Sequence, residues 1–186
     1  MSGARSALPG FNSPAVGFEQ PYDMLAACHE RVQRSLDLLM RLIAHVRTQG
    51  HDVQSQSAAR DVLRYFDLAA PQHHLDEERH VFPRLLTQGS AAEQALVQRL
   101  QTEHREMEAL WTQLRPALQS WSTAHEPSPL EELEPLAQRY TALYAQHLND
   151  ENTLVFPVAQ THTPAQELAA MGAEMQARRT GTPSAS

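Results

Sequence analysis

Four long stretches of this sequence repeat their apolar residues at steps of three and four, the spacing that places side chains on one face of an α-helix. They run from about Pro21 to Gln49, Asp52 to Gln88, Ala91 to Trp121 and Pro129 to Pro157. Glycine is scarce, with 7 in 186 residues, which also favours helix. Short links and one apolar stripe per segment predict an all-α fold, an antiparallel up-down four-helix bundle.

The predicted bundle occupies residues 21–160. Residues 1–20 mix Gly, Pro and Ser, so we expect an irregular N-terminal arm, which Phe11 and Phe18 could hold against the bundle. Residues 161–186 predict a short C-terminal helical appendage, ending near Arg179, and a disordered tail. Pro71 and Pro83 fall inside the second segment, where each removes a backbone hydrogen bond and is expected to kink or end the helix.

The charge and cysteine content exclude several classes of protein. The formal net charge is −7, and no basic stripe is visible that could neutralise nucleic-acid phosphates. A single cysteine, Cys28, excludes an internal disulfide framework and fits a reducing compartment. The sequence shows no signal peptide and no span of membrane length, so we expect a cytoplasmic protein without membrane or nucleic-acid partners.

Each apolar stripe carries a histidine where a hydrophobic residue is expected. These histidines are His29, His73, His104 and His147. In two stripes a glutamate follows one helical turn later, within the related stretches HHLDEERHVFP (73–83) and HLNDENTLVFP (147–157). Glu77 and Glu151 stand four residues after their histidines, so each His–Glu pair shares one helix face.

The spacing of these histidines divides the chain into two similar helical hairpins. His73 lies 44 residues after His29, and His147 lies 43 residues after His104. Hairpins packed about a pseudo-twofold axis would place four imidazoles and two carboxylates around one cavity. Buried carboxylates are costly, and two that face each other repel, which would raise the pKa of at least one.

Cations between the carboxylates would remove both problems. Imidazole with carboxylate suits iron, zinc or manganese. Two glutamates can bridge two metals while each metal takes two histidines, which leaves positions open for water, oxo or a small diatomic ligand. We therefore predict metal ligands at His29, His73, Glu77, His104, His147 and Glu151.

Neighbouring residues offer alternative ligands. His74 and Glu78 also form an i, i+4 pair, but Leu148 and Asn152 stand at the matching places of the second stretch, so we expect His74 and Glu78 to face away. Glu108, one turn after His104, is a candidate seventh ligand. We expect His80 to be exposed or beside the ligands.

Other nearby side chains are given structural interpretations. We expect Glu103 to be a surface acid and Cys28 to be a small buried hydrophobe. Asp76 and Asp150 repeat as well, and either a solvated face or support of a ligand imidazole fits them. Tyr140 or Tyr144, on the same segment as His147, could donate a hydrogen bond to a bound oxygen species or simply fill the core.

At these residues the sequence resembles the hemerythrin-like family, the HHE cation-binding domain, over roughly residues 22–160. The resemblance implies a four-helix bundle with a non-haem di-iron centre held by the six positions named above. The Phe-Pro pair after each acid, at 82–83 and 156–157, is similar too.

The chain also departs from the oxygen-carrying members of that family. Those have a second histidine where this chain has Glu108, and an aspartate five residues after the last histidine, where this chain has Glu151 at four. The pattern is closer to di-iron proteins implicated in iron–sulfur cluster repair, although the cysteine-bearing N-terminal domain typical of those proteins is not seen.

The sequence thus predicts a di-iron (di-metal) protein that binds or senses dioxygen or nitric oxide at a carboxylate-bridged centre. The cofactor is two iron ions, with zinc or manganese as substitutes. One alternative is an iron donor, a cluster-repair protein or an enzyme that reacts with oxygen, peroxide or nitric oxide. Another is a metal store or structural zinc site. We favour a binding protein over an enzyme, and the sequence does not identify a protein partner.

Overall fold

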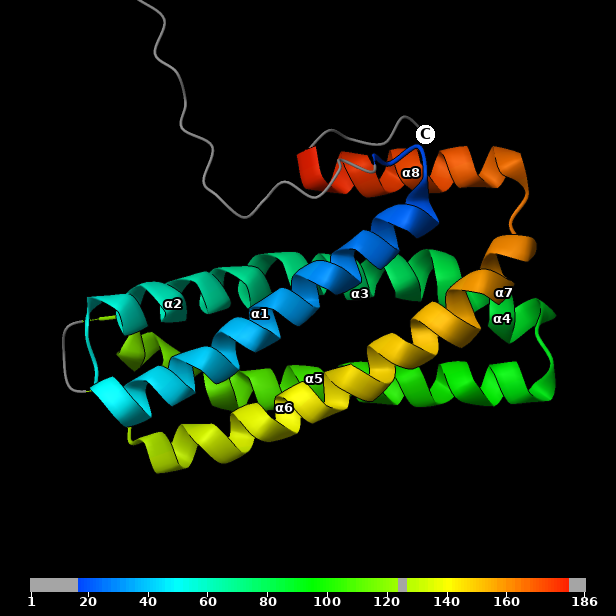
Figure 1. Ribbon diagram of the computed structural model, residues 1–186. Coiled ribbons are helices and arrows are strands. Elements are labelled where there is room, and N and C mark those ends of the chain that lie inside the picture. The colour runs from blue at the N-terminus through cyan, green and yellow to red at the C-terminus, as the bar shows by residue number, and fades with distance from the viewer. Residues whose placement is uncertain (1–16, 124–126, 181–186) are drawn as a thin grey trace, which may run out of the picture.

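The computed structural model describes residues 17–123 and 127–180. All regular elements in these ranges are helical, and four rods lie side by side in an up-down bundle (Figure 1). The first rod is α1 (Pro21–Gln49), and the third is α5 (Ala91–Trp121). The second contains α2 (Val53–Arg64), η1 (Tyr65–Ala69), α3 (Ala70–Asp76), η2 (Glu77–Val81) and α4 (Phe82–Gln88). The fourth contains α6 (Leu130–Asp150), η3 (Glu151–Val155) and α7 (Phe156–Thr161), and α8 (Ala165–Thr180) is the C-terminal appendage. The predicted fold class is confirmed.

Short, well-capped links connect the first three rods. Gly50 ends α1 with φ of 83°, a backbone region that favours glycine. The Asp52 carboxylate then accepts a hydrogen bond from the Ser55 amide (2.9 Å) at the start of α2, and Ser90 with Glu93 forms a second capping box at the start of α5. These caps satisfy amides that a helix start leaves unpaired, so the chain reverses within a few residues.

The prolines at 71 and 83 do not end the second rod. Each is preceded by a π-helical turn (η1, η2), and Pro157 follows a third (η3). The residue before each proline donates its amide to the carbonyl five residues earlier, as Phe82 does to Glu77. A proline ring crowds the carbonyl four residues earlier, and the wider π turn makes room for it, so the helix continues.

The third π turn also changes the core pattern of the fourth rod. In a regular α-helix Leu154, three residues after Glu151, would lie on the inward face, but its side chain is 50 % exposed, whereas Val155 is fully buried. The π turn adds one residue between Glu151 and the next inward position, which shifts the phase of the stripe. Val81 occupies the equivalent buried position after Glu77.

The bundle contains two apolar clusters. The larger one, in the half where α6 begins, is built around Leu36, Phe66, Leu114 and Tyr140. The smaller one, in the half where α1 begins, includes Leu25, Phe82, Leu100, Phe156 and Met175. In each rod, the histidines and glutamates predicted as ligands lie where one apolar cluster gives way to the other. A polar layer is therefore enclosed by apolar side chains on both sides.

The appendage α8 lies along the outside of the bundle, near the start of α1 (Figure 1). Arg178 and Arg179 both pair with the fully buried carboxylate of Asp76, and the Arg179 guanidinium also stands 5.5 Å from the centre of the Phe18 ring. A Cβ atom at Gly172 would lie 1.9 Å from the Phe18 carbonyl oxygen, so this close approach requires glycine. Phe18 therefore contacts the appendage, while Phe11 lies outside the described residues.

Candidate metal centre

The fold brings together all six residues that the sequence predicts as ligands. His29 comes from α1, His73 and Glu77 from α3 and η2, and the remaining three from α5, α6 and η3. All six side chains are buried, and both glutamates are completely inaccessible to solvent. They form two groups of four that could each hold a metal ion: one contains His29, His73, Glu77 and Glu151, and the other contains Glu77, His104, His147 and Glu151.

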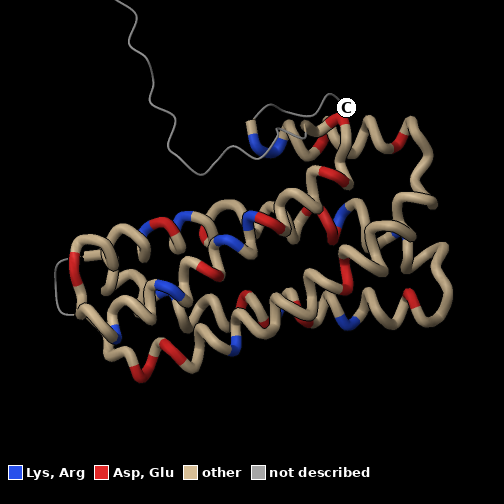
Figure 2. The backbone as a smooth tube through the Cα atoms, viewed as in Figure 1, with Lys and Arg blue, Asp and Glu red and all other residues tan. Residues whose placement is uncertain are grey.

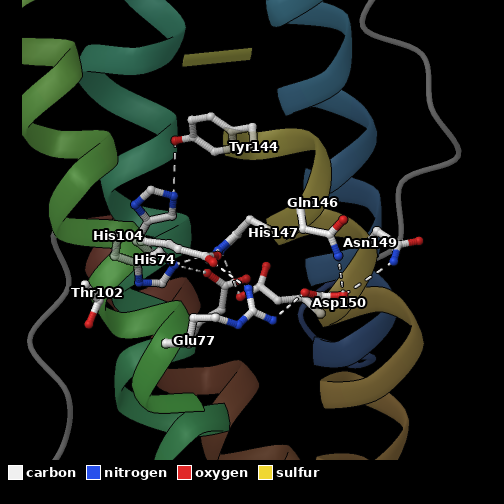
Figure 3. A network of polar contacts seen from close by, with 12 residues as sticks. His74, Glu77, Thr102, His104, Tyr144, Gln146, His147, Asn149 and Asp150 are labelled. Atoms are coloured by element: carbon white, nitrogen blue, oxygen red, sulfur yellow. Dashed lines mark hydrogen bonds and ion pairs between the residues drawn. The ribbon is translucent and has the colours of Figure 1, made fainter. Parts of the chain in front are cut away.

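Both glutamates belong to both groups, and the oxygens of each carboxylate are divided between them. Glu77 directs Oε1 toward the first group, 3.1 Å from His73 Nε2, and Oε2 toward His104 Nε2 at 3.5 Å. Glu151 directs Oε2 toward His29 Nε2 and Oε1 toward His147 Nε2, both at 3.2 Å. Figure 3 shows Glu77, His104 and His147 converging between the helices. Each carboxylate therefore connects the two groups.

Several atoms of this cluster are buried without a hydrogen-bond partner. They are both ring nitrogens of His73, Glu77 Oε2 and both carboxylate oxygens of Glu151. A buried polar atom without a partner costs free energy, and a buried carboxylate costs more. Imidazole nitrogens and carboxylate oxygens that converge in this way fit iron, zinc or manganese. The donor set therefore fits the predicted cofactor.

Three of the four imidazoles are held from behind. His29 Nδ1 is hydrogen-bonded to Asn152 Oδ1 (2.8 Å), His104 Nδ1 to Glu78 Oε1 (3.0 Å), and His147 Nδ1 to Glu103 Oε2 (2.9 Å). In each case the outer nitrogen donates its proton, so Nε2 faces the centre and is the nitrogen that can bind an ion once the ring is neutral. These bonds orient the rings toward the two groups.

Two of these outer partners correct the expectations from sequence. Glu103 was expected on the surface, but its carboxylate bonds His147 and also pairs with Arg99. Glu78 was expected to face away, yet it bonds His104 and accepts a hydrogen bond from Gln101 (2.8 Å). Each stands next to an inward residue, at the edge of the inward face of its helix. From there its side chain reaches the outer nitrogen of an imidazole on the neighbouring rod.

His74 was also expected to face away, and it too contacts the centre. Its ring stacks on that of His104 with centroids 4.1 Å apart and planes 13° apart, and its Nε2 is hydrogen-bonded to the Tyr144 hydroxyl (3.2 Å; Figure 3). Burial, followed by the charges of His104 and His147, holds the pKa of His74 well below its usual value, so its ring is neutral.

A cavity of about 330 Å³ opens beside this His74–Tyr144 pair. Its walls are largely apolar and include Phe66, Met107 and Trp111. Glu108 lies at the same cavity, but its side chain is exposed and belongs to neither group of four, so the structure gives no support to a seventh ligand.

Phenylalanines that follow the two glutamates cover the centre. Phe82 stacks on the His104 ring at 5.4 Å, and Phe156 stacks on the His29 ring at 5.0 Å, each with planes 25° apart. The helix continues past each Phe-Pro pair, and the two phenylalanine rings cover the imidazoles of His104 and His29.

Protonated imidazoles balance the glutamates in the metal-free chain. Burial opposes protonation of His29, but the carboxylates of Glu151 and Glu77, which lie 3.2 Å and 3.4 Å from its Nε2, outweigh burial and raise its pKa to about 9. Burial likewise opposes protonation of His147, but the charge of Glu151 and the hydrogen bond with Glu103 raise its pKa to about 10. Burial would raise the pKa of Glu151, yet His147 and His29 lower it well below its usual value. The pKa of Glu151 is therefore lowered rather than raised, because neighbouring cationic rings stabilise its charge.

The remaining predicted side chains lie outside the two groups. His80 Nε2 pairs with Glu174 of α8 at 2.6 Å, and Asp150 pairs with Arg99 at 2.5 Å rather than facing solvent alone. Cys28 is buried beside Met24 and Arg31, as expected for a small hydrophobe. Basic and acidic residues are interleaved along the described helices (Figure 2). Within residues 17–123 and 127–180, no helix combines the length and apolarity needed to cross a membrane.

A helical bundle with buried, overlapping histidine–glutamate groups defines a class of cation-binding domain. A family model agrees: the hemerythrin HHE cation binding domain matches residues 20–159. The chain belongs to this family. It is also similar to an uncharacterized protein of Haemophilus influenzae, with 28 % identity over 162 residues, which cover 87 % of this chain and 91 % of the relative.

Proposed function

We propose that the six residues hold two iron ions, with Glu77 and Glu151 as bridging ligands and two histidines completing each position. The observation that carries the proposal is the division of each carboxylate's oxygens between the two groups. Buried atoms without a hydrogen-bond partner in the same cluster, His73 Nε2, Glu77 Oε2 and both carboxylate oxygens of Glu151, support it, because an ion would satisfy them. Such a pair of ions supplies open coordination positions for a small diatomic ligand and electrons for its binding.

We further propose that this protein binds or senses dioxygen or nitric oxide. Phe82 and Phe156 keep water from the ligand imidazoles, as a reversible binding site requires. The neutral His74 ring and the Tyr144 hydroxyl form a hydrogen-bonded pair in the wall of the 330 Å³ cavity, which His104 also lines, so a ligand entering from the cavity would meet this pair beside His104. The cavity is mostly apolar, which suits dioxygen and nitric oxide better than a charged substrate.

The test is reconstitution of the metal-free chain with ferrous iron under anaerobic conditions. The protein is then exposed separately to dioxygen, nitric oxide and hydrogen peroxide while optical spectra are recorded. Reversible spectral changes with dioxygen or nitric oxide are the expected result. Turnover of any of the three would replace this proposal with the enzyme alternative. Transfer of iron to an acceptor without ligand binding would favour an iron donor or repair role, and a colourless protein that retains zinc would favour a structural or storage site.

A further inference from the structure

The two halves of the metal centre correspond residue by residue. His29 corresponds to His104, His73 to His147, and Glu77 to Glu151, and Phe82 and Phe156 stack on equivalent rings. The correspondence extends to the outer partners of the imidazoles, because the residue after each bridging glutamate bonds the lone histidine of the other half. Asn152 bonds His29, and Glu78 bonds His104.

The second outer position breaks the symmetry of charge. Glu103, the residue before His104, bonds Nδ1 of His147. The equivalent residue before His29 is Cys28, and Nδ1 of the equivalent ring, His73, has no hydrogen-bond partner. The Cys28 thiol instead faces Met24 Sδ at 3.5 Å.

The ligand sets of the two metal positions are alike, so the difference in charge between them lies behind the ligands. The first position, with His29 and His73, has an amide and a thiol at the two outer places. The second position, with His104 and His147, has two carboxylates there. In this sense the first is the neutral position and the second is the anionic position.

Both carboxylates of the anionic position are fixed in place. Glu78 accepts a hydrogen bond from the Gln101 amide, and this neutral donor does not neutralise the negative charge of Glu78. Glu103 is held by Arg99, which shares its charge with Asp150. The Glu103 side chain is largely buried, so solvent screens its effect on His147 only partly.

A carboxylate behind a ligand imidazole strengthens that ligand. It draws on the Nδ1 proton, which makes Nε2 a better electron donor, and its charge offsets that of the ion. Removing one such partner typically lowers metal affinity about tenfold to a hundredfold. Competing protons reduce the benefit, because a ring made more basic toward an ion is also more basic toward a proton.

We infer that the two positions are unequal, and that the anionic position of His104 and His147 binds a divalent ion first and at least tenfold more tightly than the neutral position. This inference rests on the proposed function, since it assumes that the six residues hold two ions. It gives the chain a defined one-ion state. The ion at the neutral position, next to Cys28 and Asn152, is then the exchangeable one.

The test must separate unequal positions from repulsion between ions. Two ions bridged by the same carboxylates repel each other, so two binding steps would be seen even for equal positions. We therefore compare two double variants. His29→Ala with His73→Ala leaves the anionic position intact, and His104→Ala with His147→Ala leaves the neutral position intact. Each is titrated with Co²⁺ at pH 8 by calorimetry and optical spectroscopy.

We expect the variant with the anionic position to bind Co²⁺ at least tenfold more tightly. Adding Glu78→Gln and Glu103→Gln to that variant should remove the difference. The matched control is Asn152→Asp in the other variant, which supplies a carboxylate behind His29 and should tighten the neutral position. Equal Co²⁺ affinities of the two double variants would overturn the inference. So would a loss of Co²⁺ affinity on Glu78→Gln and Glu103→Gln that is no larger than the loss these changes cause in the neutral-position variant.

Crystals of the unaltered chain grown with one equivalent of Co²⁺ provide an independent test should a double variant fail to fold. Anomalous scattering then reports which position is occupied. Higher occupancy between His104 and His147 is expected, and equal or reversed occupancy contradicts the inference. Failure to bind two ions at saturating Co²⁺ would instead refute the proposed di-metal function, so the two failures are distinguishable.

Discussion

Loading the metal centre is expected to release protons, because the ions replace protons that balance Glu77 and Glu151 in the metal-free chain. His29 and His147, one in each position, have pKa values raised to about 9 and about 10. Both rings are therefore protonated at pH 7. A metal ligand must be unprotonated at Nε2, so each ion has to displace one of these protons.

The pKa values set the size of this effect. One pH unit between the solution and a pKa corresponds to about 1.4 kcal/mol, so at pH 7 deprotonation costs about 3 kcal/mol for His29 and about 4 kcal/mol for His147. The apparent affinity of each position is therefore expected to rise about tenfold per pH unit from pH 7 to about 9. Above that range the rise levels off.

Isothermal calorimetry measures the release directly. Titration of the metal-free chain with Zn²⁺ in two buffers of different ionisation enthalpy gives the number of protons released per ion, which we expect to be about one at pH 7. In the control variant Glu103→Gln, the pKa of His147 is lower and fewer protons are released from its position. Binding heats independent of the buffer, or an affinity that does not change from pH 7 to pH 9, would refute this account of the electrostatics.

The same raised pKa values affect the stability of the metal-free chain. A histidine with a folded-state pKa above its unfolded value stabilises the fold fully below about pH 6.5, and this stability is lost as pH rises through the folded-state pKa. We therefore expect the metal-free chain to unfold at lower denaturant concentration as pH rises from 6.5 to about 10, while the metal-loaded chain changes less; equal dependence in both forms would argue against it. Glu77→Ala should reduce bound metal to one ion or none by elemental analysis, whereas Glu108→Ala should leave it unchanged; the reverse would show that the ligands are assigned wrongly. Asp76→Asn removes the buried charge that binds two arginines of α8, so we expect a loss of roughly 2 kcal/mol in unfolding free energy and faster proteolysis within α8, and an unchanged cleavage pattern would contradict this role. Val155→Ala should lower the unfolding free energy by roughly 2 kcal/mol and Leu154→Ala by less than about 0.5 kcal/mol, and similar losses would place the π turn elsewhere.

Helix periodicity was sufficient to predict the four rods and the inward direction of His73 and Glu77. Each inward polar residue interrupts an apolar stripe, and such a residue is conspicuous because the surrounding positions are hydrophobic. The match between the two stretches that begin at His73 and His147 then separated Glu77 from its neighbour Glu78. The first conclusion comes from residues close in sequence, where helix geometry determines the direction, and the second needs the comparison of the two stretches.

Longer-range partners could not be predicted in this way. Glu103 and Glu78 are one residue off the inward phase, and only the packing of neighbouring rods brings them behind His147 and His104. The repeat itself contained a usable signal, because the residue after each bridging acid bonds the opposite lone histidine. The pairing of Asp76 with α8 had no such signal, since the appendage has no counterpart in the first half of the chain.

Anomalous diffraction from crystals of the iron-loaded chain tests the central claim most directly. Data collected at the iron absorption edge should show two peaks per chain, one beside His29 and His73 and the other beside His104 and His147. Both peaks should adjoin the carboxylates of Glu77 and Glu151, as the division of their oxygens predicts. A single peak, or two peaks that do not share these carboxylates, would contradict the carboxylate-bridged centre.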